Sequence, residues 1–181
     1  MTNQFGVHSE VGKLRKVIVH RPDLSLKRLT PSNHDDLLFD DVLWVERAQW
    51  EHDQFVKIMR DRGTEVFYHV DLLAEALAAS EAGRQRAIEL VASEYTVGWS
   101  LVDEVRSFLS TMKADVLARH LVGGLTIGEM EEMGFDLPKY RQISLGAAAI
   151  DEQGYFVITP VPNTLFQRDP SCWIYNGVTV N

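Results

Sequence analysis

The sequence predicts an α/β protein in which a helical segment interrupts alternating strands and helices. Three observations support this class. Residues 16–69 have the pattern strand, helix, strand; the stretch from residue 71 to about 143 has helical patterns and almost no strand signal; and strand patterns return at residue 155. We therefore expect a first α/β part at residues 1–70, an all-helical insert at 71–145, and a continued α/β part at 146–181.

The first part is built around one helix. A β-branched run at residues 16–20 predicts a strand, which the following Arg-Pro pair ends. Asp41 is expected to cap the next helix, and Gly63 stands where its C-terminal cap belongs. Residues 65–69 then alternate like a strand, which completes a βαβ-type unit. One predicted helix face carries apolar or aromatic residues three or four positions apart: Trp44, Ala48, His52, Phe55 and Met59.

Later elements are predicted from capping and turn signals. Residues 100–103 and 126–129 both have the capping-box pattern at the start of a helix. A strand is expected at 155–158. Asn176-Gly177 between two β-type triplets predicts a hairpin turn. Its second strand has barely begun at residue 181, so we expect a chain that stops within a sheet.

Composition limits the function classes. The 181 residues include 18 Lys plus Arg and 26 Asp plus Glu, for a net charge of −8, which disfavours nucleic acid and anionic membranes as partners. Apolar residues make up 45%, enough for a core, and no apolar run approaches the ~20 residues that span a bilayer. No secretory signal is visible. With Cys172 as its single cysteine, the chain is expected to be cytoplasmic, without disulfides or a cysteine-based zinc site.

The segment from Asn163 to Pro170 is the first candidate site. It places Arg168 and Asp169 between prolines and between two predicted strands, where functional loops collect. A carboxylate there could hold a guanidinium group through two parallel hydrogen bonds. The alternative is a local Arg168–Asp169 turn with no ligand, and composition leaves both open.

Other polar residues favour structural interpretations. The acidic group of Asp35, Asp36, Asp40 and Asp41 could serve acid–base chemistry, or could complement a helix N-terminus. None of the six histidines forms a metal-spaced pair, so each is expected to be structural. Cys172 lies in a predicted strand, where cysteine is usually an unreactive small apolar residue. No glycine-rich nucleotide motif is present, and no metal or cofactor is expected.

Three segments taken together resemble arginine deiminase. They are FGVHSEVGKLRKVIVHRP at residues 5–22, LTPSN with LLFDD, WV and EHD at 29–53, and PNTLFQRDP with CWIY and GVT at 162–179. The LLFDD block, at its distance from the first segment, is the most specific. The resemblance covers essentially the whole chain, including the helical insert, and it matches the N-terminal half of the family.

This resemblance implies a fold and a reaction. The family fold is a five-fold pseudosymmetric α/β propeller of the pentein type, of which this chain would form part. The family reaction hydrolyses L-arginine to L-citrulline and ammonia without a cofactor, through a covalent amidino-cysteine intermediate. It also implies a role in arginine catabolism and a homo-oligomer.

The resemblance assigns roles residue by residue. Asp169 would be catalytic, binding the guanidinium nitrogens and accepting a proton as ammonia forms. Phe166 would pack on the guanidinium face, and Asn163 would contact the amino or carboxylate end of arginine. Leu38 would line the channel and contribute a backbone carbonyl. Arg168 would brace the loop.

The family nucleophile lies further along the chain than any residue here, and Cys172 matches a strand position. We therefore expect a chain that needs a missing C-terminal half, is inactive alone, and self-associates through exposed strand edges. Two alternatives remain. One is a stand-alone module that binds arginine or a partner subunit without catalysis. The other is a related guanidine-modifying hydrolase, against which the helical insert argues.

Overall fold

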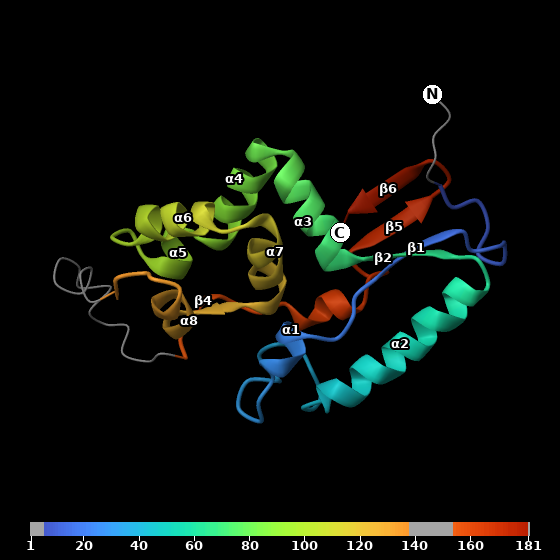
Figure 1. The fold of residues 1–181 in the computed structure, drawn as a ribbon, viewed down its shortest axis with the longest axis horizontal. Coiled ribbons are helices and arrows are strands. Elements are labelled where there is room, and N and C mark those ends of the chain that lie inside the picture. The colour runs from blue at the N-terminus through green and yellow to red at the C-terminus, as the bar shows by residue number, and fades with distance from the viewer. Residues whose placement is uncertain (1–5, 138–153, 181) are drawn as a thin grey trace.

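The computed structural model describes residues 6–137 and 154–180 (Figure 1). These residues form three two-stranded sheets with helices between and around them. The predicted boundary between residues 145 and 146 lies outside the described residues. Within the described ranges, no helix has both the length and the apolar character needed to cross a bilayer.

The βαβ unit predicted for the first part is confirmed. Strand β1 (Lys16–Val19) pairs in parallel with β2 (Glu65–Tyr68), and helix α2 (Val45–Asp61) connects them. Val19 on β1 packs against Val56 and Met59 on α2, which holds the helix to the sheet. A short helix α1 (Leu24–Lys27) follows β1 before the chain reaches α2.

The apolar face predicted for α2 is partly wrong: Met59 is buried as expected, but the other buried positions lie one residue after Trp44 and Phe55. Trp44 and Phe55 are 73% and 56% exposed, whereas Val45, Val56 and Met59 are buried. Both faces satisfy the helical spacing, and contact with the sheet decides between them.

Of the two predicted ends of α2, the N-terminal one is wrong and the C-terminal one is confirmed. Asp41 is not the cap, because the N-cap residue is Trp44 and the Asp41 carboxylate accepts from the adjacent Val42 N–H. At the other end, the Gly63 N–H donates to the carbonyl of Arg60, and the Thr64 N–H donates to that of Met59. Gly63 has a φ of +78°, so this is the left-handed termination that favours glycine.

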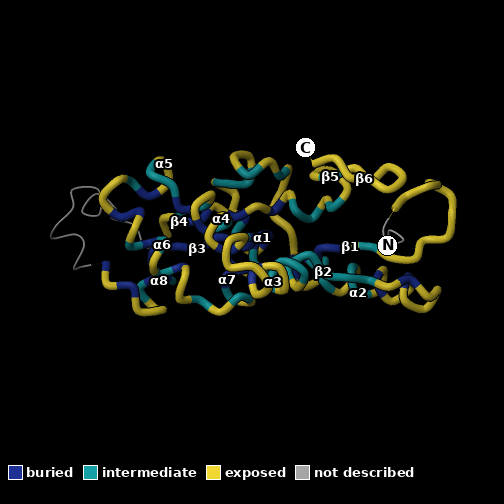
Figure 2. Tube along the Cα trace, turned by 90° about the horizontal axis from the view of Figure 1, so that it is seen from above, coloured by how far each residue is buried: buried dark blue, intermediate teal, exposed yellow. Residues whose placement is uncertain are grey.

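The helical segment contains most of the buried core. Its helices are α3 (His69–Ala79), α4 (Glu81–Val91), α5 (Glu94–Val97), α6 (Val102–Thr111), α7 (Ala114–Gly123) and α8 (Ile127–Glu132). Ile88, Leu109, Leu117 and Met130 are fully buried in one cluster. Figure 2 shows the same concentration of buried chain around these helices.

One of the two predicted capping boxes is confirmed. Thr126 and Glu129 cap α8 reciprocally. The box predicted at Ser100 is wrong, because α6 begins one residue later, with Leu101 as its N-cap.

Two further two-stranded sheets lie later in the chain. Strand β3 (Leu125–Thr126) pairs antiparallel with β4 (Phe156–Ile158), which joins the helical segment to the chain that follows it. After the 3-10 helix η1 (Pro162–Leu165), β5 (Ser171–Ile174) and β6 (Gly177–Val180) form the predicted hairpin.

The hairpin turn lies one residue earlier than predicted. Its central residues are Tyr175, with φ of +50°, and Asn176, because Gly177 already pairs with Ile174. Tyr175 also exchanges two backbone hydrogen bonds with Val7, at 2.8 and 2.7 Å. Residues 172–180 are exposed (Figure 2). The described strands make an α/β arrangement of small sheets, and no closed propeller is present among them.

Candidate substrate-binding site

The candidate site begins with the loop between α1 and α2. Leu26 and Leu29 are buried against Val45 at the start of α2, and Leu37 and Phe39 pack on the same cluster. This apolar contact fixes both ends of the loop against the body of the molecule, so its central residues project outward.

Backbone and side-chain hydrogen bonds then set the shape of that loop. The Asn33 side chain accepts from the Thr30 N–H at 2.7 Å and donates to the Arg28 carbonyl at 2.9 Å. The Phe39 N–H donates to the His34 carbonyl, and the His34 ring lies 2.8 Å from the Phe39 carbonyl. The turn places Leu38 at φ of +59°, with its side chain 80% exposed. A leucine held in this conformation indicates a loop whose shape is determined by its surroundings.

The loop between α1 and α2 forms one wall of the candidate site, and η1 with the residues after it forms the second. Pro162 is buried, and the Val161 N–H donates to the Val122 carbonyl on α7. The N–H groups of Phe166 and Asp169 donate to the carbonyls of Asn163 and Phe166 respectively, so the chain from η1 to Asp169 is tightly turned.

The structure brings these two walls together. The Asn163 side-chain amide donates to the Leu37 carbonyl at 3.1 Å, across 126 residues of sequence. The rings of Phe39 and Phe166 stack with centroids 6.3 Å apart, and Leu165 packs on the leucine cluster beneath. Three predicted site residues, Leu38, Asn163 and Phe166, therefore lie on one junction between the two loops. The backbone carbonyl that contacts Asn163 is that of Leu37, the residue before Leu38.

Asp169 and Arg168 point to different interactions. Asp169 is exposed and is tied by its N–H to Phe166, whose ring is half exposed. Arg168 forms an ion pair with Glu10 at 3.2 Å. This ion pair joins the segment that carries Asp169 to the N-terminal chain.

The acidic group surrounds the exposed tip of the first loop. Asp35, Asp36, Asp40 and Asp41 are all exposed, and the first turn of α2 is instead complemented by Glu46. The helix-terminus interpretation of this group is therefore wrong. With Asp169 on the other wall, the junction has negative charge on both sides, which favours a cationic ligand.

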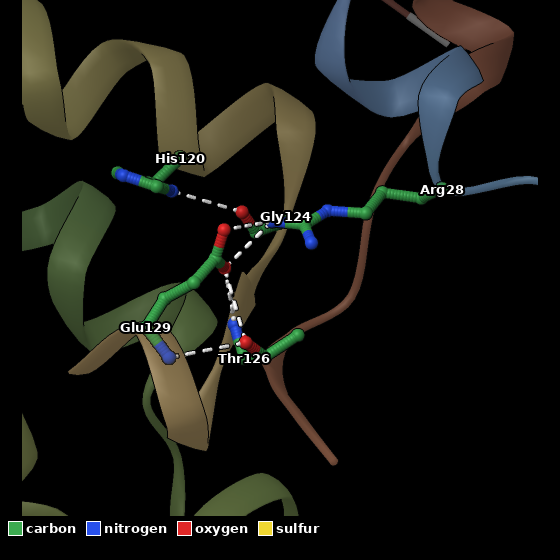
Figure 3. A network of polar contacts seen from close by, with 5 residues as sticks. All are labelled: Arg28, His120, Gly124, Thr126 and Glu129. Carbon is green, nitrogen blue, oxygen red and sulfur yellow. Dashed lines mark hydrogen bonds and ion pairs between the residues drawn. The ribbon is translucent and has the colours of Figure 1, made fainter. Parts of the chain in front are cut away.

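An ion pair anchors the first loop to the helical segment (Figure 3). Both Glu129 carboxylate oxygens lie 2.6 Å from Arg28 Nη2, and one of them accepts from the Thr126 N–H at 3.0 Å. Burial by itself would raise the pKa of Glu129, but the hydrogen bonds from Arg28 and Thr126 outweigh it and lower that pKa. The Arg28 carbonyl is the acceptor for Asn33, so this anchor connects directly to the loop that carries Leu38.

Sequence reasoning missed Arg28 and Phe39 as parts of this arrangement. Arg28 directly precedes the LTPSN motif, and Phe39 is part of the LLFDD motif. Their partners, Glu129 and Phe166, are more than 100 residues away, and no local pattern indicates such pairs.

The remaining candidates stay apart from the junction. Cys172 is an exposed, free cysteine on β5. His20 and His69 directly follow β1 and β2 and lie beside each other, and His52 on α2 lies against Tyr68 at the end of β2. Across the described parts of the chain, no group of three or more His, Cys, Asp or Glu side chains is placed to hold a metal ion.

Comparison with known proteins identifies the family. A family model described as arginine deiminase matches residues 35–181. The chain belongs to the arginine deiminase family. This match includes the acidic group and Leu38 of the first loop, and Asn163, Phe166 and Asp169 of the second.

Two relatives show how much of a family member is present. The chain is 46% identical over 176 residues to an arginine deiminase of Mycolicibacterium gilvum (strain PYR-GCK). It is 43% identical over 170 residues to one of Rhodococcus erythropolis (strain PR4 / NBRC 100887). These alignments cover 97% and 94% of this chain but only 42% and 40% of the relatives. The chain thus spans about two fifths of the length of these arginine deiminases.

Proposed function

We propose that this chain supplies one wall of the arginine-binding site of an arginine deiminase. The observation that carries the proposal is the junction between the Asn163 amide and the Leu37 carbonyl, which joins two loops inside the region matched by the family. Asp169 is the catalytic carboxylate that binds the guanidinium nitrogens, while the proton that the departing amino group takes up comes from residues outside these 181. Phe166 packs on the guanidinium face, Leu38 lines the channel, and Asn163 contacts the amino or carboxylate end of arginine.

The chemistry requires residues outside these 181. A cysteine thiolate attacks the guanidinium carbon of L-arginine, and the C–N bond breaks to release ammonia. Water then hydrolyses the amidino-thioether, which releases L-citrulline and restores the thiolate. Cys172 is not this nucleophile, because its family position is that of a strand residue after the Arg-Asp-Pro motif. The chain alone is therefore inactive.

We extend the proposal to the fold of the whole protein. The small sheets are parts of a five-module α/β propeller, with residues 71–145 as a helical insert between residues 1–70 and 146–181. The exposed β5–β6 hairpin supports this, because unpaired strand edges and apolar side chains such as Trp173 and Ile174 favour pairing with further strands. The whole protein is a homo-oligomer.

A chimeric enzyme tests this function. Residues 1–181 are joined to the part of the Mycolicibacterium gilvum relative that the alignment does not cover, and citrulline release from L-arginine is measured. We expect activity from the chimera and none from residues 1–181 alone. D169N should lower kcat/KM by about 100-fold or more, since each hydrogen bond to a charged group contributes ~1.5–3 kcal/mol.

Further variants of the chimera distinguish substrate binding by Asn163 from the catalytic role of Asp169. N163A removes the contact with the Leu37 carbonyl and should raise KM more than it lowers kcat. D103N, a change of one exposed carboxylate in the first turn of α6 and outside both loops, is the control and should leave kcat/KM within about twofold. Full activity of D169N, or citrulline release by residues 1–181 alone, would refute the proposal.

A further inference from the structure

The loop that carries Leu38 is attached to the helical segment through Arg28. Arg28 is the C-cap residue of α1 and stands directly before this loop. Its guanidinium group reaches α8, where the Nη2 atom lies 2.6 Å from both carboxylate oxygens of Glu129 (Figure 3). The two residues are 101 positions apart, so this ion pair connects the first loop to a part of the fold that is distant in the sequence.

The pairing of β3 with β4 positions two contacts to this guanidinium group. Thr126 on β3 faces Phe156 on β4 in the strand register. The Phe156 ring centroid lies 5.6 Å from Arg28 Cζ, within the range of a cation–π contact. Glu129 is fixed beside the same pair of strands, because its carboxylate accepts from the Thr126 N–H at 3.0 Å. Arg28 is therefore held by a carboxylate and a ring that one small sheet keeps in place.

Partial burial makes this ion pair a firmer attachment than an exposed pair. The side chains of Arg28 and Glu129 are 18% and 28% exposed, whereas those of Arg47 and Glu51 on α2 are 52% and 60% exposed. Less contact with water strengthens the attraction between two charges, and loss of one partner leaves the other partly buried and unpaired. Removal of either charge should therefore loosen the attachment of the first loop.

Hydrogen bonds continue from Arg28 through the loop to the junction. The Arg28 carbonyl accepts from the Asn33 side-chain amide at 2.9 Å. The Asn33 carbonyl accepts from the Leu37 N–H at 3.1 Å. The Leu37 carbonyl in turn accepts from the Asn163 side-chain amide at 3.1 Å. Arg28 and the carbonyl that contacts Asn163 thus belong to one hydrogen-bonded unit.

Apolar packing beneath the loop does not replace these polar contacts. Leu37 and Phe39 pack on the leucine cluster, but hydrophobic contact is non-directional, whereas a hydrogen bond requires the carbonyl to face its donor. Leu38, the next residue after Leu37, has φ of +59°, a conformation that persists only where the surroundings enforce it. The direction of the Leu37 carbonyl therefore depends on the hydrogen-bonded unit that begins at Arg28.

We propose that Arg28 and Glu129 are positioning residues for the arginine site. Their ion pair holds the Leu37 carbonyl where it orients the Asn163 amide, and the helical segment thereby sets the affinity for L-arginine. In this role neither charged side chain touches the substrate, so the ion pair affects binding through Asn163 and does not affect the chemical step. The inference rests on the proposed function, in which Asn163 contacts the amino or carboxylate end of arginine.

Steady-state kinetics of the chimeric enzyme test the proposal. R28M removes one charge and keeps the backbone carbonyl at position 28. E129Q removes the other charge, while a glutamine at this position still completes the capping box of α8. Each variant should raise KM for L-arginine about three- to tenfold and leave kcat within about twofold. E132Q, an exposed change on the same helix, is the control and should alter neither constant.

A double variant shows whether the effect on KM passes through the junction. N163A already lacks the contact with the Leu37 carbonyl, so R28M should raise KM in the parent chimera and add little to N163A. Independent actions of the two residues would multiply. A KM of R28M/N163A equal to the product of the two separate increases would therefore overturn the proposal, as would an unchanged KM in both R28M and E129Q.

Amide hydrogen exchange in the 181-residue chain tests the positioning without any catalysis. R28M should speed exchange of the Leu37 and Phe39 N–H groups, which donate within the loop, and leave the amides of α6 as protected as before. Unchanged exchange in the loop, or equal acceleration in α6, would overturn the proposal. An unaltered chimera that releases no citrulline would instead refute the proposed function, and the exchange result would still decide whether the ion pair holds the loop.

Discussion

Acid should destabilise this protein well above the pH range in which carboxylates titrate, and His20 is the principal cause. Burial lowers the pKa of His20 from its ordinary 6.5 to about 4. The unfolded chain therefore binds a proton at this position more readily than the folded chain does. Stability is fully present above pH 6.5 and is lost as the pH falls from 6.5 toward 4.

The size of the effect follows from those two values. The linkage relation gives a loss of about 2 kcal/mol by pH 5 and about 3 kcal/mol by pH 4 for His20 alone. His52 and His69 add to the loss in the same direction, because burial lowers the pKa of each. Between pH 7 and pH 5 most carboxylates remain ionised, so the change in that interval reports mainly on the histidines.

Urea unfolding followed by circular dichroism at pH 7, 6 and 5 measures this loss. In H20Q the side chain does not titrate, so the fall in unfolding free energy between pH 7 and pH 5 should shrink by about 2 kcal/mol. H8Q is the control, because His8 is exposed, and it should keep the full pH dependence. Equal pH dependence of H20Q and H8Q would refute the argument that His20 is buried in its neutral form.

Three further predictions concern stability and are measured by the same unfolding experiment at pH 7. G124A should lower the free energy of unfolding more than G98A does. Both glycines have φ near +80°, but only at Gly124 would an added Cβ lie 3.0 Å from atoms of Ile158 and Pro160. Equal losses of about 1–2 kcal/mol in the two variants would show that backbone strain alone sets the effect. L109A should lower the free energy of unfolding by about 2–5 kcal/mol, because Leu109 is fully buried. V180A, at an exposed position, is the control and should lower it by less than about 0.5 kcal/mol. A loss as small in L109A would place Leu109 outside the core. E129Q should lower the free energy of unfolding by about 1–3 kcal/mol, because Arg28 would stay partly buried without its carboxylate partner. E131Q is the control and should leave the free energy of unfolding nearly unchanged. No loss in E129Q would mean that the Arg28–Glu129 ion pair does not hold the loop.

The sequence alone determined the local elements. The βαβ unit, the glycine end of α2, the Thr126–Glu129 box and the final hairpin depend on signals within a few residues of each other, so a pattern search finds them. The family resemblance likewise depended on short motifs and their spacing. It indicated Leu38, Asn163, Phe166 and Asp169 before any contact was known.

Only the tertiary structure decided which residues meet. The buried face of α2 depends on which side the β1–β2 sheet occupies, and Trp44 and Val45 both fit a helical stripe. The contact of Asn163 with the Leu37 carbonyl spans 126 residues, and the Arg28–Glu129 pair spans 101. The histidines at the ends of β1 and β2 likewise come together only because the two strands are parallel and in register. Local preferences specify helices and strands, whereas burial and long-range pairing select among the arrangements that those preferences allow.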